Sequence, residues 1–106
     1  MASVRWSNRA LEDLRSIRFY LEGSASELVS ERYANAITES TKRLSIFPQM
    51  GRVVPEYDDA EFREVISGSY RVTYLTQDFD SVFIVAIVHG RRDIRAALGT
   101  EPGSIT

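Results

Sequence analysis

The amino-acid sequence predicts an α+β fold: an N-terminal strand and a helical hairpin, then a three-stranded antiparallel meander forming one small sheet with the helices packed on one face. Two amphipathic stretches of helical period come first, and three strand-like stretches follow them. The 106 residues, 43% of them hydrophobic, suffice for one compact core. We therefore expect residues 1–98 to form a single domain and residues 99–106 to form a flexible C-terminal tail.

The N-terminal part predicts a short strand and one helix. Residues 3–6 alternate in hydropathy as a half-buried strand does, and Ser7 follows them as a candidate N-cap. Gly23 stands where a left-handed C-cap would close the helix. The apolar stripe of this helix, with spacings of four, three and four, consists of Ala10, Leu14, Ile17 and Leu21.

A longer second helix is expected next. Ser24 and Glu27 have the spacing of a capping box, and Pro48 cannot continue a helix, so these residues mark its start and its end. Two consecutive amphipathic helices with a short link predict a helical hairpin. The residues expected on the buried side of the second helix are Val29, Tyr33, Ile37, Ser40, Leu44 and Phe47.

A loop and three strands complete the predicted fold. Residues 49–61 contain glycine, proline and four acids, a composition typical of a solvated loop. Residues 62–66 and 70–76 predict the first two strands, and residues 77–80 a turn into the third. The third strand, residues 82–88, is continuously apolar, which indicates a strand that is covered on both faces or lies centrally in the sheet.

Composition excludes several classes of protein. The chain has no cysteine, and the lone His89 cannot build a zinc site by itself, so we expect no metal and no cofactor. No stretch approaches the roughly 20 apolar residues that span a bilayer, and no signal segment is visible, so we expect a cytoplasmic protein without a membrane partner. The net charge of −2 argues against a wholly basic nucleic-acid-binding surface, so any contact with an anionic partner must be local.

Several short motifs occur in a fixed order along the chain. They are Ala-Leu-Glu-Asp-Leu at 10–14, Phe-Pro-Gln-Met-Gly-Arg at 47–52, Tyr-Arg-Val-Thr-Tyr at 70–74, and Val-Ala-Ile-Val-His-Gly-Arg-Arg-Asp at 85–93. Together they resemble the RelE/ParE toxin superfamily over residues 4–98. The His-Gly-Arg-Arg-Asp ending looks more like the ParE branch than the RelE branch.

The resemblance implies the toxin of a type II toxin–antitoxin system, held in a hetero-oligomer by a cognate antitoxin, ParD-like or another DNA-binding protein. DNA would then be reached only through the antitoxin, whose extended C-terminal segment wraps the toxin. Tyr20, Leu28 and Tyr57 are our candidates for exposed antitoxin-binding side chains, with ordinary packing as the alternative. The acidic residues 56–61 are expected to form a solvated loop, or else to meet basic residues of the antitoxin.

A RelE-like ribonuclease would need cations that stabilise an anionic transition state and groups that move protons. Arg71 and Arg92 match arginines that the RelE branch uses, and His89 would be the possible proton carrier. The two lysine positions of that branch fall on Phe62 and Glu64, and we expect Glu64 to repel a phosphate. The C-terminal tyrosine of that branch falls on Leu98. We therefore expect no catalytic residues, and RNA cleavage is the alternative function.

The resemblance to the ParE branch implies a toxin that inhibits DNA gyrase by binding. The candidate target-binding residues are His89, Arg91, Arg92, Arg95 and Arg71. Each of these residues has a structural alternative. His89 would be a hydrogen-bonded structural histidine, and the arginines at 91, 92 and 95 would belong to a solvated C-terminal segment. Arg71 would be a strand arginine paired with a local acid such as Glu64. A third possibility is a degenerate toxin that only binds its antitoxin.

Overall fold

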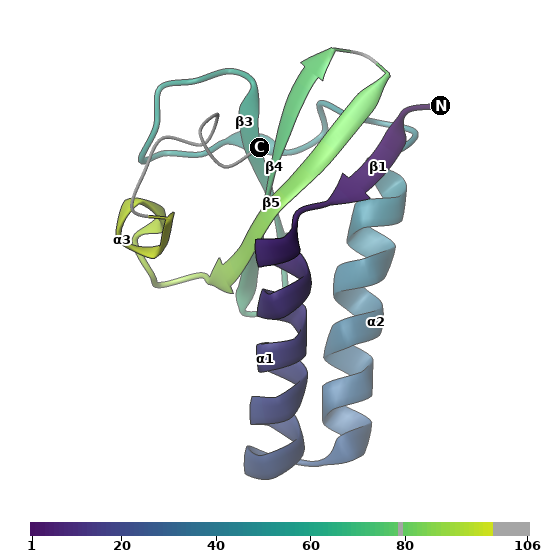
Figure 1. Cartoon of the computed structure of the whole chain (residues 1–106), viewed down its shortest axis with the longest axis vertical. Coiled ribbons are helices and arrows are strands. Elements are labelled where there is room, and N and C mark those ends of the chain that lie inside the picture. The colour runs from purple at the N-terminus through teal and green to yellow at the C-terminus, as the bar shows by residue number, and fades with distance from the viewer. Residues whose placement is uncertain (79, 99–106) are drawn as a thin grey trace.

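The computed structural model describes residues 1–78 and 80–98, and within these ranges it confirms the α+β fold (Figure 1). The tail predicted for residues 99–106 lies outside the described residues. The elements in chain order are β1 (Ser3–Trp6), α1 (Asn8–Ser24), α2 (Glu27–Arg43), β2 (Arg52–Val53), β3 (Phe62–Ser67), β4 (Tyr70–Asp78), β5 (Ser81–His89) and α3 (Ile94–Leu98).

The described strands form one sheet with the order β1-β5-β4-β3-β2. The meander β3-β4-β5 is antiparallel as predicted, whereas β1 pairs in parallel with β5, from Ser3 opposite Ser81 to Trp6 opposite Ile84. The short edge strand β2 lies in the segment that we expected to be entirely loop. β4 extends to Asp78, which pairs with Ser81, so β4 takes in the first half of the turn predicted for residues 77–80.

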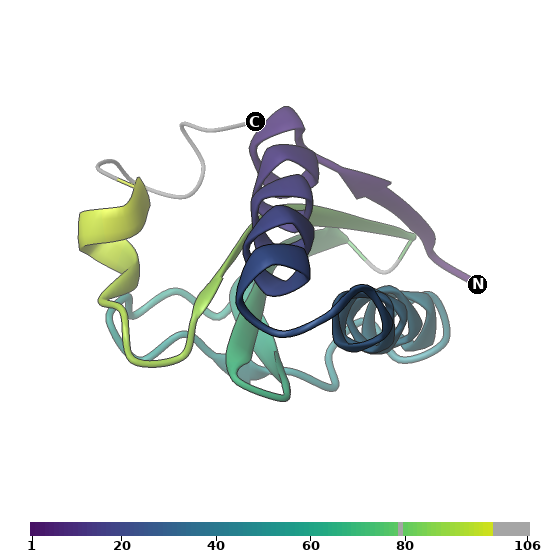
Figure 2. The same cartoon turned by 90° about the horizontal axis from the view of Figure 1, so that it is seen from below.

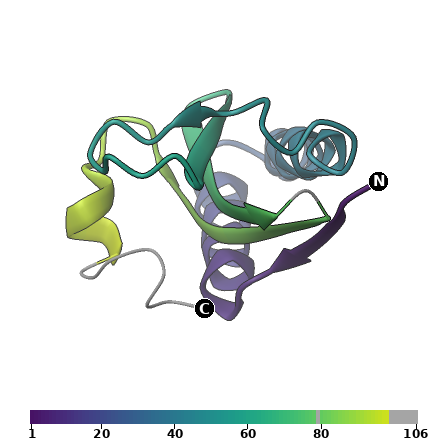
Figure 3. The same ribbon diagram turned by 90° about the horizontal axis from the view of Figure 1, so that it is seen from above.

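Both faces of the sheet are covered. α1 and α2 pack on one face over a core that includes Ile37, Leu44 and Tyr74. The opposite face carries a second, smaller core, in which Ile94 of α3 meets Phe62 of β3 and Val88 of β5. Figures 2 and 3 show the ribbon of α3 on another side of the sheet from the ribbons of α1 and α2, and a hydrogen bond from Arg9 of α1 to the Ala97 carbonyl, at 3.2 Å, links α3 to the hairpin. The prediction of helices on one face therefore holds for the hairpin but not for α3, and the apolar run of β5 is explained by its two covered faces.

The start of α1 completes the edge of β5. β1 pairs with β5 only as far as Ile84, and beyond that point α1 supplies the partners that the backbone of β5 requires. The Ser7 backbone N–H donates to the Ile84 carbonyl at 2.9 Å, and the Ser7 hydroxyl donates to the Val85 carbonyl at 2.7 Å. A carboxylate oxygen of Asp13 then accepts the Ile87 N–H at 2.9 Å. This contact explains why an aspartate follows the first turn of α1.

The ends of the first two helices differ partly from prediction. Ser7 caps α1 as expected, because its Oγ accepts the Ala10 N–H at 2.9 Å. Gly23 does not close α1: the helix runs on to Ser24, and Gly68 is the one glycine with positive φ among the described residues. The cap of α2 is Ser26, whose Oγ accepts a backbone N–H at 3.1 Å, and not Ser24, which remains helical.

The prediction for the end of α2 was also wrong. The helix stops at Arg43, and the chain continues through turns before it reaches Pro48. Leu44 is fully buried as predicted, but the Phe47 side chain is 63% exposed. Because the helical rotation ends at Arg43, the period that placed Phe47 on the buried stripe no longer applies there. No helix in the described part of the chain is long and apolar enough to cross a membrane.

Gly51 precedes β2 at a point where two backbones come close together. Its N–H donates to the hydroxyl of Tyr74 at 3.0 Å, and a Cβ built on it would lie 2.5 Å from the Glu64 carbonyl oxygen and 2.7 Å from that hydroxyl. The backbone carbonyl cannot retreat, because it belongs to β3 in the middle of the β2–β3–β4 pairing. Only glycine therefore fits here.

We expect Gly51→Ala to lower the free energy of unfolding by about 1–3 kcal/mol, the usual cost of overpacking a core. Gly23→Ala is the matched control, because a Cβ at Gly23 in α1 meets nothing within 4 Å. That helical glycine should gain about 0.5–1 kcal/mol on replacement by alanine. Urea unfolding of both variants measures the two effects, and a loss of stability of the same size in both would contradict the close approach at Gly51.

Candidate functional site

The candidate target-binding residues lie where β5 leaves the sheet. β5 ends at His89, the Gly90 N–H donates to the Ser69 carbonyl at 2.7 Å, and the Arg92 N–H donates to the His89 carbonyl at 2.9 Å. This turn carries the chain towards the buried Ile94, which begins α3. We call residues 89–95 the arginine segment. The side chains of His89, Arg91, Arg92 and Arg95 in it are exposed.

Arg71 is not exposed with them, because its side chain retains only 6% of its accessible surface. Its Nε donates to Glu64 Oε1 at 2.7 Å, and its Nη1 and Nη2 donate to the two carboxylate oxygens of Glu56, both at 2.7 Å. Nη1 also donates to the Arg92 carbonyl at 3.0 Å. The structural alternative for Arg71, pairing with Glu64, is therefore what the structure contains, and its guanidinium is turned inward.

The two carboxylates around Arg71 join three parts of the chain. Glu64 is fully buried on β3 and also accepts from Arg52 Nε at 2.7 Å, while Glu56 comes from the acidic loop and accepts the Ile94 N–H at 3.0 Å. The hydrogen bonds from Arg71 lower the pKa of Glu56 from its usual value near 4.5 to about 2. The bonds from Glu56 in turn raise the pKa of Arg71. Two cations and two carboxylates thus form a neutral set that we call the Arg71 network.

The Arg71 network corrects two expectations about acidic residues. Glu64 cannot repel a phosphate at the surface, because it is enclosed and neutralised by Arg71 and Arg52. Glu56 is not part of a solvated loop, since only 16% of its side chain is exposed, whereas Asp58, with Asp59 and Glu61, is exposed as predicted. Sequence reasoning missed the role of Glu56 because it lies in a run of acids whose other members are solvated.

Two of the three candidate antitoxin-binding side chains are exposed, and the third is only partly so. Tyr20 on α1 is 65% exposed and Leu28 on α2 is 58% exposed, as predicted. Tyr57 is only partly exposed, because its ring packs edge-on against Phe62, with 5.4 Å between the ring centroids. For Tyr57 the alternative, ordinary packing, is therefore what the structure contains. Sequence reasoning missed the exposed apolar side chains after α2, which are Ile46, Phe47 and Met50 and line a hollow of about 410 Å³.

The residues of the alternative ribonuclease site do not converge. Tyr70 lies opposite His89 in the β4–β5 pairing, and Arg71 lies opposite Val88. Because neighbouring residues of a strand point to opposite faces, the Arg71 side chain and the His89 side chain lie on opposite faces of the sheet. Phe62, at one of the lysine positions of the RelE pattern, is fully buried.

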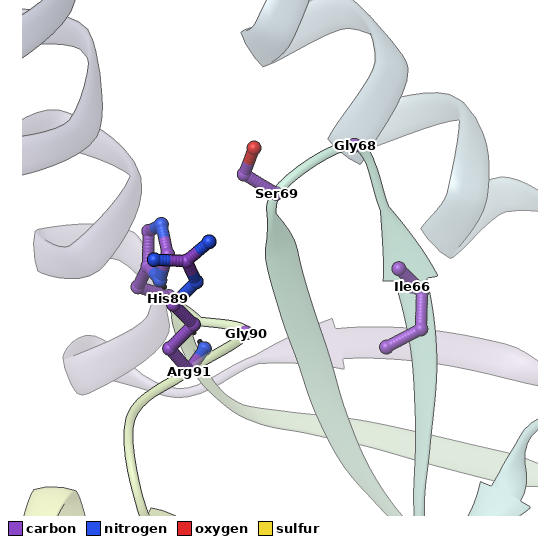
Figure 4. Close-up of a pocket in the computed structure, with 6 residues that line it drawn as sticks. All are labelled: Ile66, Gly68, Ser69, His89, Gly90 and Arg91. Carbon is purple, nitrogen blue, oxygen red and sulfur yellow. Dashed lines mark hydrogen bonds between the residues drawn. The ribbon is translucent and has the colours of Figure 1, made fainter.

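A hollow of about 480 Å³ opens beside the arginine segment (Figure 4). It lies between the β3–β4 turn, which supplies Gly68 and Ser69, and the end of β5, which supplies His89 to Arg91. The sequence singled out His89 and Arg91 but gave no signal for Ser69. In the described part of the chain, no three histidine, aspartate or glutamate side chains are grouped so that they could hold a metal ion.

The chain is similar to known toxins in sequence and in structure. The model of the ParE toxin of type II toxin–antitoxin systems, parDE, matches residues 4–94. Toxin RelE2 of Caulobacter vibrioides is 37% identical over 93 residues, which are 87% of this chain and 99% of that protein.

Two solved structures show the same fold. A chain of the chromosomal ParDE system from P. aeruginosa aligns with a TM-score of 0.70 and 18% identity, over 84% of this chain and 96% of that one. A chain of the toxin–antitoxin complex RelBE2 from Mycobacterium tuberculosis aligns with a TM-score of 0.62 and 23% identity, over 83% of this chain and 96% of that one. At these identities the likeness supports the fold alone.

Arg71→Ala should lower the free energy of unfolding by about 3–5 kcal/mol, because it leaves two carboxylates buried without their main partner. Arg52→Ala is the matched control: it removes an arginine from the same Glu64, but the Arg52 side chain is 62% exposed. Its cost should stay below about 1 kcal/mol. Chemical denaturation measures both, and comparable losses in the two variants would refute the central place of Arg71.

The low pKa of Glu56 predicts how the free energy of unfolding depends on pH. Since folding lowers this pKa, Glu56 stabilises the protein fully above pH 4.5, and its contribution is lost as the pH falls from 4.5 towards 2. We expect the stability difference between the wild type and Glu56→Gln to be largest above pH 4.5 and to shrink below it. Urea unfolding at a series of pH values measures this difference. A difference that does not change with pH would show that Glu56 does not titrate as described.

Proposed function

This chain belongs to the ParE toxin family of type II toxin–antitoxin systems, and we propose that it inhibits DNA gyrase by binding to it. In this proposal a cognate antitoxin, ParD-like or another DNA-binding protein, neutralises the toxin in a hetero-oligomer. Inhibition is then a matter of interface energy, because the bound toxin stabilises one state of its target. No bond of the target is broken by the toxin.

The observation that carries this proposal is the enclosure of Arg71. A ribonuclease of this superfamily would need cationic side chains directed at the scissile phosphate. The guanidinium of Arg71 instead donates to Glu56, to Glu64 and to the Arg92 carbonyl. To meet a phosphate it would have to leave Glu56 without an ion-pair partner and Glu64 with only the exposed Arg52, which is costly in a site of low dielectric constant.

The arginine segment supplies the contact surface in the proposal. In the described part of the chain, no ion pair occupies the guanidinium of Arg91 or Arg92, and that of Arg95 makes only an exposed pair with Asp93 at 3.4 Å. An exposed pair of this kind contributes little and can be exchanged for a partner's carboxylate. Guanidinium groups favour such bidentate contacts, and arginine is enriched at interfaces. We propose that these arginines and His89 contact the target.

Arg71 contributes to this surface indirectly. Its bond to the Arg92 carbonyl, together with the bond from the Ile94 N–H to Glu56, fixes the backbone on which the exposed arginines stand. A preorganised backbone lowers the entropy cost of binding. Arg71 is thus a positioning residue for the proposed interface.

Exposed apolar side chains support an antitoxin as the second partner. Leu28 and Tyr20 on the helical hairpin, and Phe47 and Met50 after it, are each between 49% and 65% exposed. Exposed apolar side chains that gather in one place, as Phe47 and Met50 do around one hollow, often mark protein-binding surfaces. We propose that the antitoxin covers them.

The second candidate function is ribosome-dependent cleavage of messenger RNA. It is favoured by the 37% identity to a protein named toxin RelE2. In this alternative Arg92 would stabilise the phosphate and His89 would move a proton, and both are exposed on the arginine segment. New 5′ ends in messenger RNA soon after induction would be its sign.

The test is to induce the toxin without its antitoxin in a bacterium that carries a DNA-damage-response reporter. Gyrase inhibition of this kind leaves broken DNA, so we expect growth arrest together with a strong reporter signal. Growth arrest with a silent reporter would overturn the gyrase proposal in favour of RNA cleavage. Absence of any arrest, with the antitoxin still bound tightly, would indicate a degenerate toxin.

The double variant Arg91→Ala/Arg92→Ala should still bind the antitoxin, but cells that make it should neither stop growing nor show the reporter signal. Arg15→Ala, which removes an arginine with a 75% exposed side chain from α1, is the matched control and should remain toxic. Point variants are preferable to a deletion after Gly90, because such a deletion would also remove Ile94 from its buried position beside Phe62.

A further inference from the structure

Aromatic rings from several elements meet where the end of the sheet reaches the helical hairpin. Tyr33 of α2 packs edge-on against Tyr70 of β4, and Tyr70 packs edge-on against His89 of β5, each with 5.9 Å between ring centroids. Burial raises the pKa of Tyr70, and the neighbouring Tyr33 and Tyr20 raise it further. The ring of Tyr70 thus packs against both the ring of Tyr33 and the exposed ring of His89.

The hollow of about 480 Å³ lies beside this aromatic corner. Its lining contains no acidic side chain: it consists of Ile66, Gly68, Ser69, His89, Gly90 and Arg91 (Figure 4). A smaller hollow of about 210 Å³ shares Gly68 with it and adds the exposed Arg32. The volume of the larger hollow, about 480 Å³, is typical of sites for small molecules or single nucleotides.

The turn that forms one wall of the hollow is rigidly built. Gly68 has φ of +59°, which a two-residue hairpin turn requires at its first position. A Cβ there would also meet the ring of Tyr33 at 3.2 Å, so the turn packs directly on α2. The opposite wall is tied to this turn by the bond from the Gly90 N–H to the Ser69 carbonyl. The hollow therefore exists before any ligand binds.

The polar groups of the hollow are donors. His89 Nδ1 accepts the Arg91 backbone N–H at 3.2 Å, which places the proton of the neutral ring on Nε2 and leaves that N–H for a ligand. The Ser69 hydroxyl and the Arg91 guanidinium are both at the surface. Donors of this kind, with no carboxylate in the lining, favour an anion.

We propose that this hollow binds one phosphodiester-linked nucleotide of single-stranded nucleic acid. The phosphate accepts from the Arg91 guanidinium and the Ser69 hydroxyl, and the base stacks on the exposed ring of His89. Aromatic platforms beside cations are how proteins bind single strands without reading their sequence. A protein carboxylate would use the arginine but would leave this ring without a partner, so the ring favours a base.

This site does not depend on gyrase being the target, because the purified toxin is expected to bind the strand by itself. The net charge of the chain, −2, repels a polyanion from the rest of the surface, so binding must be local and weakened by salt. Because binding should be local and weakened by salt, a few variants of the lining residues suffice to test the proposal.

The experiment measures fluorescence anisotropy of labelled oligothymidine and oligouridine strands of about 12 nucleotides, titrated with the purified full-length toxin. The titrations are repeated between about 50 and 200 mM salt, since the slope of log affinity against log salt counts phosphate contacts. Circular dichroism melting confirms that each variant is folded. Stronger binding of the DNA strand would identify DNA as the source of the nucleotide, and stronger binding of the RNA strand would identify RNA.

Arg91→Ala should lower the salt slope by about 0.7, the value for one phosphate contact to a single strand. His89→Ala should weaken binding about fivefold or more through the loss of stacking. Arg15→Ala makes the same change of charge on α1, away from the hollow, and should leave the slope as in the wild type. Absence of binding to both strands, or equal changes in Arg91→Ala and Arg15→Ala, would overturn the proposal.

Discussion

The pairing of Arg71 with two buried carboxylates is the interaction on which the rest of the molecule depends. Glu64 belongs to the sheet, Glu56 to the acidic loop, and the Arg92 carbonyl to the segment after β5, so one guanidinium joins three parts of the chain. Each charge is taken out of water and is tolerated only because its partners are present. The second core, with Ile94 at its centre, lies against this network and closes the sheet on that face.

The same network bears on the two functions proposed for this toxin. An arginine at the position of Arg71 can face a phosphate only when its guanidinium is not paired with an acid in the interior. Here the guanidinium is paired with both Glu56 and Glu64. In the segment that follows β5, by contrast, the side chains of Arg91, Arg92 and Arg95 are exposed. The buried arginine thus determines where the exposed ones stand, which suits a protein that acts by binding.

Local patterns were reliable where the local backbone decides the outcome. The cap at Ser7, the stripe of α1 and the three meander strands follow from short-range spacing, and the structure contains them. Predictions failed where a second signal of equal strength lay nearby. Ser26 competes with Ser24 as a cap, and Phe47 continues the helical period although the helix ends at Arg43. For Tyr57, exposure and packing were both open, and its ring contacts the buried Phe62.

By itself, the sequence determined the order and kind of the main elements, the absence of cysteine chemistry, the exposed arginine run, and the resemblance that led to the toxin family. The tertiary structure decided the parallel pairing of β1 with β5, the burial of Arg71 and Glu56, and the aromatic corner beside His89. Periodicity and capping act over a few residues, whereas these features join residues 15 to 78 positions apart. Whether an arginine side chain faces solvent or a carboxylate depends on which distant residues lie next to it in the folded chain. Short-range sequence patterns contain no information about those residues.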